Sequence, residues 1–96
     1  MLLRDRLLAL RQDIVAAAAS CGASDVRLFG SVARGEDDEA SDVDLLIRLE
    51  PGRSLLDLVR LESRLEALLG RPVDVVTEAS LNEPTRSRAL REAIRV

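Results

Sequence analysis

The sequence predicts an α/β fold of the α+β type, in which helices pack against a small mixed β-sheet of about three strands. Two observations support this prediction. A chain of 96 residues, 47% apolar and 32% charged, is long enough to bury one core. Segments with apolar residues at helical spacing alternate along the chain with short runs typical of strands. We therefore expect one domain over residues 1–96.

The first third of the chain predicts a helix, a strand and a sharp turn. Apolar residues recur at helical spacing over residues 2–19, which indicates an amphipathic helix. Residues 25–29 form a short strand candidate, and Gly30 and Ser31 end it before a short turn or helix over 32–34. The apolar stripe of the first helix consists of Leu3, Leu7, Leu10, Ile14 and Ala17 or Ala18.

The clearest strand of the chain covers residues 42–49. Side chains alternate between the two faces of a strand, so Asp42 and Asp44 share the face opposite the apolar residues. Residues two apart on a strand are about 7 Å apart at Cα, which allows their carboxylates to meet at one point. The apolar face of this strand is formed by Val43, Leu45, Ile47 and Leu49.

The rest of the chain predicts a helix, a third strand and a last helix. Ser54 is a good N-cap for the helix over residues 55–69. The apolar side of this helix is expected to consist of Leu55, Leu58, Leu61, Leu65, Leu68 and Leu69. The β-branched run 73–77 is a short strand that contains Asp74. Asn82 can cap a final helix. The residues of that last segment expected to face inward are Leu90, Ala93 and Ile94.

Three carboxylates converge if the second and third strands are neighbours. Asp42, Asp44 and Asp74 would then repel one another and raise each other's pKa, an arrangement that favours a bound hard cation. The chain has no His and one Cys, so the donors are oxygens, which suit Mg²⁺ or Mn²⁺ better than Zn²⁺. Two such ions can clamp an in-line displacement at phosphorus.

A phosphate-binding arrangement is indicated ahead of these carboxylates. Gly30 and Ser31 leave a strand and enter a helical turn, which exposes backbone N–H groups. Ser31 adds a hydroxyl, and Arg34, one turn on, offers its fork of donors to the same phosphates. Alone, a Gly-Ser step is usually a turn and an Asp-x-Asp run is usually a solvated strand start. Their combination at a spacing of ten residues favours a nucleotide site.

Composition excludes several classes of function. Without His, neither a Ser-His-Asp triad nor a His-ligated zinc site is possible. With Phe29 as the single aromatic residue and a net charge of −3, we expect no direct binding of nucleic acid. The sequence has no apolar run of membrane-spanning length and no secretory leader, so we expect no membrane association and a cytoplasmic location.

The motifs resemble a known family. LFGSVARGE at residues 28–36, followed by SDVDLL at 41–46, resembles the signature of the DNA polymerase beta-type nucleotidyltransferase superfamily, which implies a palm-like nucleotidyltransferase fold. Within it the chain is most similar to the minimal nucleotidyltransferases. These are stand-alone catalytic domains of about this length that pair with HEPN-domain ribonuclease toxins in toxin–antitoxin modules. The resemblance covers nearly the whole chain.

The resemblance also implies roles for individual residues. Gly30 and Ser31 match the residues that hold the nucleotide phosphates. Asp42 and Asp44 match the paired metal ligands, and Asp74 matches a third carboxylate that also helps to activate the attacking hydroxyl. The implied reaction transfers AMP from ATP, with two Mg²⁺ ions, to a tyrosine hydroxyl of a cognate HEPN toxin and so neutralises it. A hetero-oligomer with that toxin is expected.

Three other functions stay open at this stage. The chain could be an antitoxin that masks the toxin by binding alone, although its intact acidic residues count against a relic site. It could transfer nucleotides to another acceptor, such as an aminoglycoside, but enzymes of that kind carry a further acceptor-binding domain. It could also be a structural domain with an acidic sheet edge. The short chain favours a macromolecular acceptor that brings its own binding surface.

Overall fold

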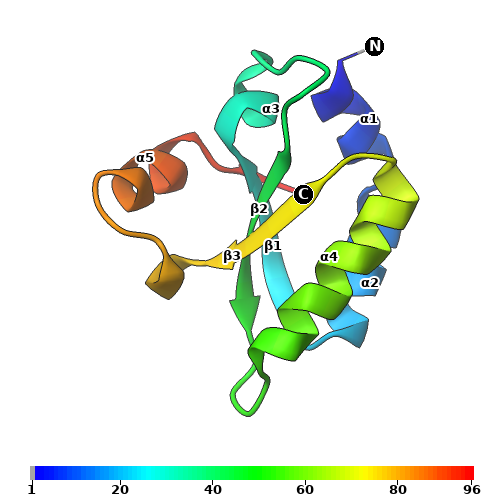
Figure 1. Cartoon of the computed structure of the whole chain (residues 1–96), viewed down its shortest axis with the longest axis vertical. Coiled ribbons are helices and arrows are strands. Elements are labelled where there is room, and N and C mark those ends of the chain that lie inside the picture. The colour runs from blue at the N-terminus through cyan, green and yellow to red at the C-terminus, as the bar shows by residue number, and fades with distance from the viewer. Residues whose placement is uncertain (1) are drawn as a thin grey trace.

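One mixed sheet of four strands forms the centre of the computed structural model, which describes residues 2–96 (Figure 1). The strands β1 (Ala23–Phe29), β2 (Val43–Leu49), β3 (Val73–Thr77) and β4 (Ile94–Arg95) are ordered β3-β2-β1-β4. β1 pairs antiparallel with β2 and β4, whereas β2 and β3 run parallel. The mixed sheet is as expected. The short β4 at its edge was not predicted.

The two faces of the sheet are covered unequally. α1, α2 and α4 lie over one face and enclose the main apolar core with the β1, β2 and β3 side chains (Figure 1). The opposite face carries a much smaller apolar cluster of Phe29, Leu46 and Ala89 beneath α5. This unequal cover leaves room beside α5 for polar side chains. The helices are α1 (Leu3–Ala9), α2 (Arg11–Ser20), α3 (Gly30–Arg34), α4 (Leu55–Leu69) and α5 (Thr85–Glu92), with the 3₁₀ turn η1 (Glu78–Ser80).

The helix predicted over residues 2–19 is broken in two at Leu10. The N–H of Leu10 donates to the carbonyls of both Arg6, at 3.2 Å, and Leu7, at 3.0 Å, so the helix tightens there. The predicted apolar stripe is otherwise confirmed, because Leu7 and Ile14 are fully buried. Met1, the first residue of the predicted domain, lies outside the described residues.

Local signals set the bounds of α4. The N–H of Ser54 donates to Oδ2 of Asp57 at 3.0 Å, as expected for a capping box, and Gly70 adopts a left-handed conformation that ends the helix. Leu61 and other apolar residues of its inner face are buried as predicted. Leu55 is an exception, because 74% of its surface is exposed at the start of the helix.

The last helix begins later than expected. α5 starts at Thr85, not directly after Asn82, and its residue buried against the sheet is Ala89. The prediction that Leu90 faces inward is therefore wrong, since 36% of it is exposed. Ala89 is small enough to bring α5 close to the sheet. None of the helices within residues 2–96 combines the length and apolar composition that crossing a membrane requires.

Two leucines of α4 test this assignment of the core. Leu61 is fully buried and Leu55 is 74% exposed. We expect Leu61→Ala to lower the free energy of unfolding by about 2–4 kcal/mol, because it leaves a cavity. The matched Leu55→Ala variant is expected to change it by less than about 0.5 kcal/mol. Urea denaturation measures both, and equal losses would contradict the assignment.

Candidate active site

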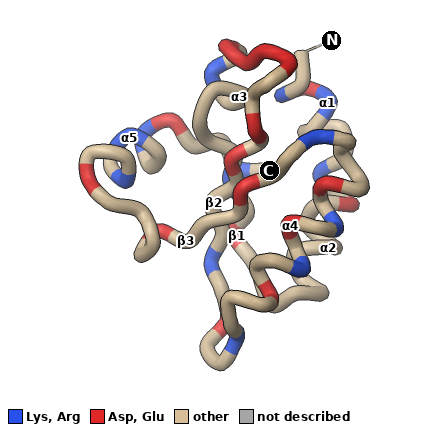
Figure 2. Tube along the Cα trace, in the orientation of Figure 1, with Lys and Arg blue, Asp and Glu red and all other residues tan. Residues whose placement is uncertain are grey.

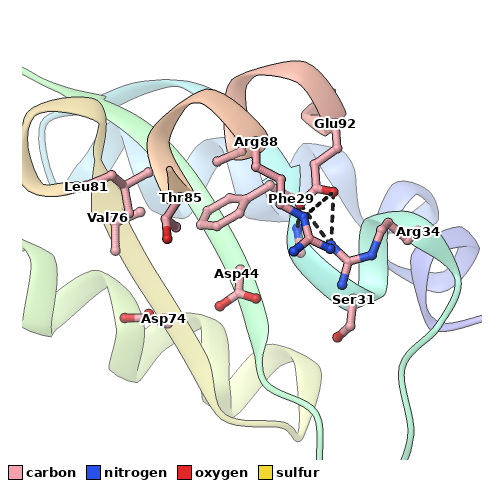
Figure 3. Close-up of a pocket in the computed structure, with 12 residues that line it drawn as sticks. Phe29, Ser31, Arg34, Asp44, Asp74, Val76, Leu81, Thr85, Arg88 and Glu92 are labelled. Atoms are coloured by element: carbon pink, nitrogen blue, oxygen red, sulfur yellow. Dashed lines mark hydrogen bonds and ion pairs between the residues drawn. The ribbon is translucent and has the colours of Figure 1, made fainter. Parts of the chain in front are cut away.

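The pairing of β2 with β3 brings two of the predicted carboxylates together. In their parallel register, Asp44 lies opposite Asp74. Paired residues of neighbouring strands point to the same face, and here this is the face away from the main core. Both residues line one pocket, which Figure 3 draws. The second and third strands are thus neighbours, and the two acidic residues share a sheet face as expected.

Gly30 allows the turn after β1 to approach Asp44 closely. Its φ of +78° lies in the left-handed region that favours glycine. A Cβ at this position would overlap Oδ2 of Asp44 and lie 3.2 Å from its Cγ. Phe29, the preceding residue, pairs with Asp44 across the β1–β2 ladder. The Gly-Ser step and the Asp-x-Asp run, ten residues apart in sequence, are therefore in contact in the structure.

The carboxylate of Asp44 lies in an unfavourable electrostatic environment. Partial burial raises its pKa from 3.8 to about 6, and the nearby carboxylates of Asp74 and Asp42 add to the effect. Arg34 opposes this rise in pKa, whereas Glu92 contributes weakly to it. Figure 2 shows how acidic residues follow one another from the loop after α3 into β2. The uncompensated negative charge at Asp44 is what a bound cation would relieve.

The donors beside these carboxylates already have a partner. Glu92 of α5 accepts the N–H of Gly30 at 3.0 Å, and its two oxygens both accept from Nη1 of Arg34, at 3.0 and 2.9 Å. Nε of Arg34 also donates to the exposed Glu36 at 2.9 Å. The two carboxylates, Glu36 first and then Glu92, raise the pKa of the Arg34 guanidinium above its usual range. This network ties α3 to α5.

A pocket of about 430 Å³ unites these groups. Its volume lies within the range of small-ligand sites. It contains five of the six predicted site residues; Asp42, exposed just before β2, does not line it. The pocket is lined by Phe29, Gly30, Ser31, Arg34, Asp44, Asp74, Val76, Leu81, Thr85, Arg88, Ala89 and Glu92 (Figure 3).

The residues of one wall of the pocket were not predicted from the sequence. Thr85, Arg88 and Glu92 of α5 all line it, together with apolar side chains such as Leu81. These three residues recur at three- and four-residue spacing and so share one face of the helix. That spacing is visible in the sequence. Which way the face points follows only from the packing of Ala89 against the sheet.

The donor set fits a hard divalent cation, although its side chains do not converge as they stand. Among residues 2–96, no three Asp, Glu, Cys or His side chains are arranged to hold a metal ion. Asp42 and Asp74 are exposed, so reorienting their side chains costs little. The available donors are carboxylate oxygens, which Mg²⁺ and Mn²⁺ prefer. The shared three-carboxylate metal site stays a prediction.

Fold and pocket together define the class of the protein as a nucleotidyltransferase. Residues 12–96 match the nucleotidyltransferase domain family, and this range contains every residue that lines the pocket. A solved structure of a minimal nucleotidyltransferase superposes with a TM-score of 0.85 at 49% identity, covering 97% of this chain and 95% of that one. The chain therefore belongs to the nucleotidyltransferase domain family, among its minimal nucleotidyltransferases.

Relatives with assigned activities point the same way. A Methanocaldococcus jannaschii chain assigned as a protein adenylyltransferase is 41% identical over 87 residues, which are 91% of this chain and 94% of that one. The protein adenylyltransferase MntA of Thermococcus cleftensis is 45% identical over 75 residues, 78% of this chain and 76% of MntA. A toxin–antitoxin structure with AMP-PNP shares the fold, with a TM-score of 0.68 at 18% identity over 96% of this chain and 70% of that one.

Replacing Gly30 tests the close approach to Asp44. Gly52 also has a positive φ, +87°, but a Cβ there would meet nothing within 4 Å. We expect Gly30→Ala to lower the free energy of unfolding by about 1 kcal/mol more than Gly52→Ala, because only the first adds steric overlap to backbone strain. Urea denaturation of the two variants makes the comparison. Equal losses would contradict the contact.

Neutralising Asp44 tests the electrostatic assignment. Its raised pKa means that the folded, metal-free protein loses stability as the pH rises from about 4 through about 6. We expect Asp44→Asn to be more stable than the parent by about 1 kcal/mol at pH 7.5, a value reduced by the partial exposure of the group. Near pH 4 the two proteins are expected to have the same free energy of unfolding. Denaturation in EDTA at both pH values is the measurement, and a less stable variant at pH 7.5 would refute the assignment.

Proposed function

We propose that this chain is an antitoxin that transfers AMP from ATP to a tyrosine hydroxyl of a cognate HEPN-domain toxin. The observation that carries the proposal is the pocket in which Asp44 and Asp74 face the N–H of Gly30 and the side chains of Ser31 and Arg34. The similarity to the protein adenylyltransferase MntA supports a protein as acceptor.

ATP binds with its phosphates against α3. The N–H of Gly30, the hydroxyl of Ser31 and the fork of Arg34 supply donors on one side of the pocket. AMP-PNP is an ATP analogue, and its presence in a toxin–antitoxin structure of the same fold supports ATP as the substrate. The apolar wall of the pocket leaves space for the less polar part of the nucleotide.

The acidic residues serve the transfer itself. Asp42, Asp44 and Asp74 would hold two Mg²⁺ ions, with Mn²⁺ as the alternative, which would supply positive charge to neutralise the attacking and leaving oxygens. Asp74 accepts the proton of the acceptor hydroxyl. The hydroxyl oxygen then forms a bond to the α-phosphorus, the bond from that phosphorus to the bridging oxygen of the β-phosphate breaks, and pyrophosphate leaves.

Inhibition by binding alone is the second candidate. Exposed apolar side chains at the start of α4 favour a surface that a partner covers: Leu55 is 74%, Leu56 61% and Val59 53% exposed. Such an antitoxin would form a stable complex without transferring a nucleotide. Transfer to a different acceptor would leave the HEPN protein unlabelled in the presence of ATP and Mg²⁺.

A transfer assay separates these functions. The protein is incubated with labelled ATP, Mg²⁺ and the HEPN-domain toxin proposed as its partner, and the modified residue is mapped by mass spectrometry. We expect label on a tyrosine of the HEPN protein, reduced about a hundredfold or more in Asp42→Asn/Asp44→Asn. Glu39→Gln is the matched control, because Glu39 is an exposed acidic residue that does not line the pocket. A stable complex without label would favour inhibition by binding.

A further inference from the structure

The carboxylate of Glu92 occupies the donors that the proposed function assigns to phosphate oxygens. Its Oε1 accepts the N–H of Gly30 at 3.0 Å, and both its oxygens accept Nη1 of Arg34, at 3.0 and 2.9 Å (Figure 3). The side chain is 18% exposed, against 66% for Glu36, the other partner of Arg34. Glu92 is thus the sheltered member of the network and Glu36 its outer member.

A carboxylate resembles a phosphate in the contacts it makes. Both are anions that present two oxygens to the planar fork of an arginine, and both accept strong hydrogen bonds from backbone N–H groups. A phosphate oxygen that takes the N–H of Gly30 must therefore replace Oε1 of Glu92. Both anions cannot stay, because like charges at contact distance in a half-buried pocket repel strongly.

The backbone at Glu92 is fixed, so only its side chain can move away. Glu92 ends α5, and two residues later Ile94 pairs with Leu28 in the β4–β1 ladder beside Gly30. Arg88 lies one helical turn earlier, with its Nε 3.9 Å from Oε2 of Glu92. A rotation of Glu92 toward Arg88 would leave the displaced carboxylate paired with a cation.

We propose that Glu92 is an intramolecular competitor of the nucleotide phosphates, which bind by displacing its carboxylate from Gly30 and Arg34. This inference rests on the proposed nucleotide site and adds the residue that sets its affinity. In the free protein Glu92 keeps the donors satisfied and Arg34 in place. Nucleotide binds only to the fraction of molecules in which the Glu92 carboxylate has moved away from Gly30 and Arg34. The observed affinity is therefore weaker than the affinity of that fraction alone.

Isothermal titration of the full chain with AMP-PNP and Mg²⁺ tests the competition. Glu92→Gln keeps the shape of the side chain but removes its charge, and we expect it to lower the Kd by about tenfold. Glu36→Gln is the matched control. It removes the other carboxylate bound to Arg34, which is exposed and does not contact Gly30, so its Kd stays within about twofold of the parent.

Several outcomes overturn the inference. A Kd for Glu92→Gln that is unchanged or higher would show that Glu92 positions Arg34 and does not compete. Absence of AMP-PNP binding in both the parent and Glu92→Gln would refute the nucleotide site, and this inference with it. Failure of the nucleotide site is thus distinguished from failure of the competition alone. A thermal melt checks folding. If Glu92→Gln does not fold, Glu92→Asp replaces it: this shorter acid cannot span Gly30 and Arg34 together, and we again expect tighter binding.

Discussion

The parallel pairing of β2 with β3 is the constraint on which the site depends. Its register sets Asp44 opposite Asp74 on the sheet face that the main core leaves open. Partial burial raises the pKa of Asp44, and the neighbouring carboxylate of Asp74 adds to this rise. The fold thus holds a cluster of negative charges that lowers the stability of the protein without ligand. A loss of stability of this kind is typical of functional sites, and here a bound cation would relieve it.

The neighbouring elements fit around this charge. Gly30 has no side chain, which lets the turn after β1 approach Asp44, and Arg34 brings a positive charge one helical turn later. α5 closes the pocket through Ala89, whose small side chain packs on the sheet, and through Glu92, which holds the donors of α3. The pocket therefore combines residues from the middle of the sequence with residues of the last helix, although the predicted motif includes only the former.

Sequence reasoning succeeded where local chemistry decides the structure. Ser54 and Gly70 set the ends of α4, and the alternation of β2 placed Asp44 away from the core. It failed where packing decides. The break at Leu10 leaves the apolar stripe continuous, so periodicity does not reveal it, and the two residues of β4 are too few to show a pattern. The position of Glu92 depends on how α5 lies on the sheet, which no local signal encodes.

A crystal structure with AMP-PNP and Mn²⁺ tests the central claim most directly, because anomalous scattering from manganese locates the metal without ambiguity. We predict manganese bound by oxygens of Asp44 and Asp74 and by the nucleotide phosphates, with the N–H of Gly30 donating to a phosphate oxygen. Manganese bound away from this pair of carboxylates, with the nucleotide phosphates remote from Gly30, would contradict the account.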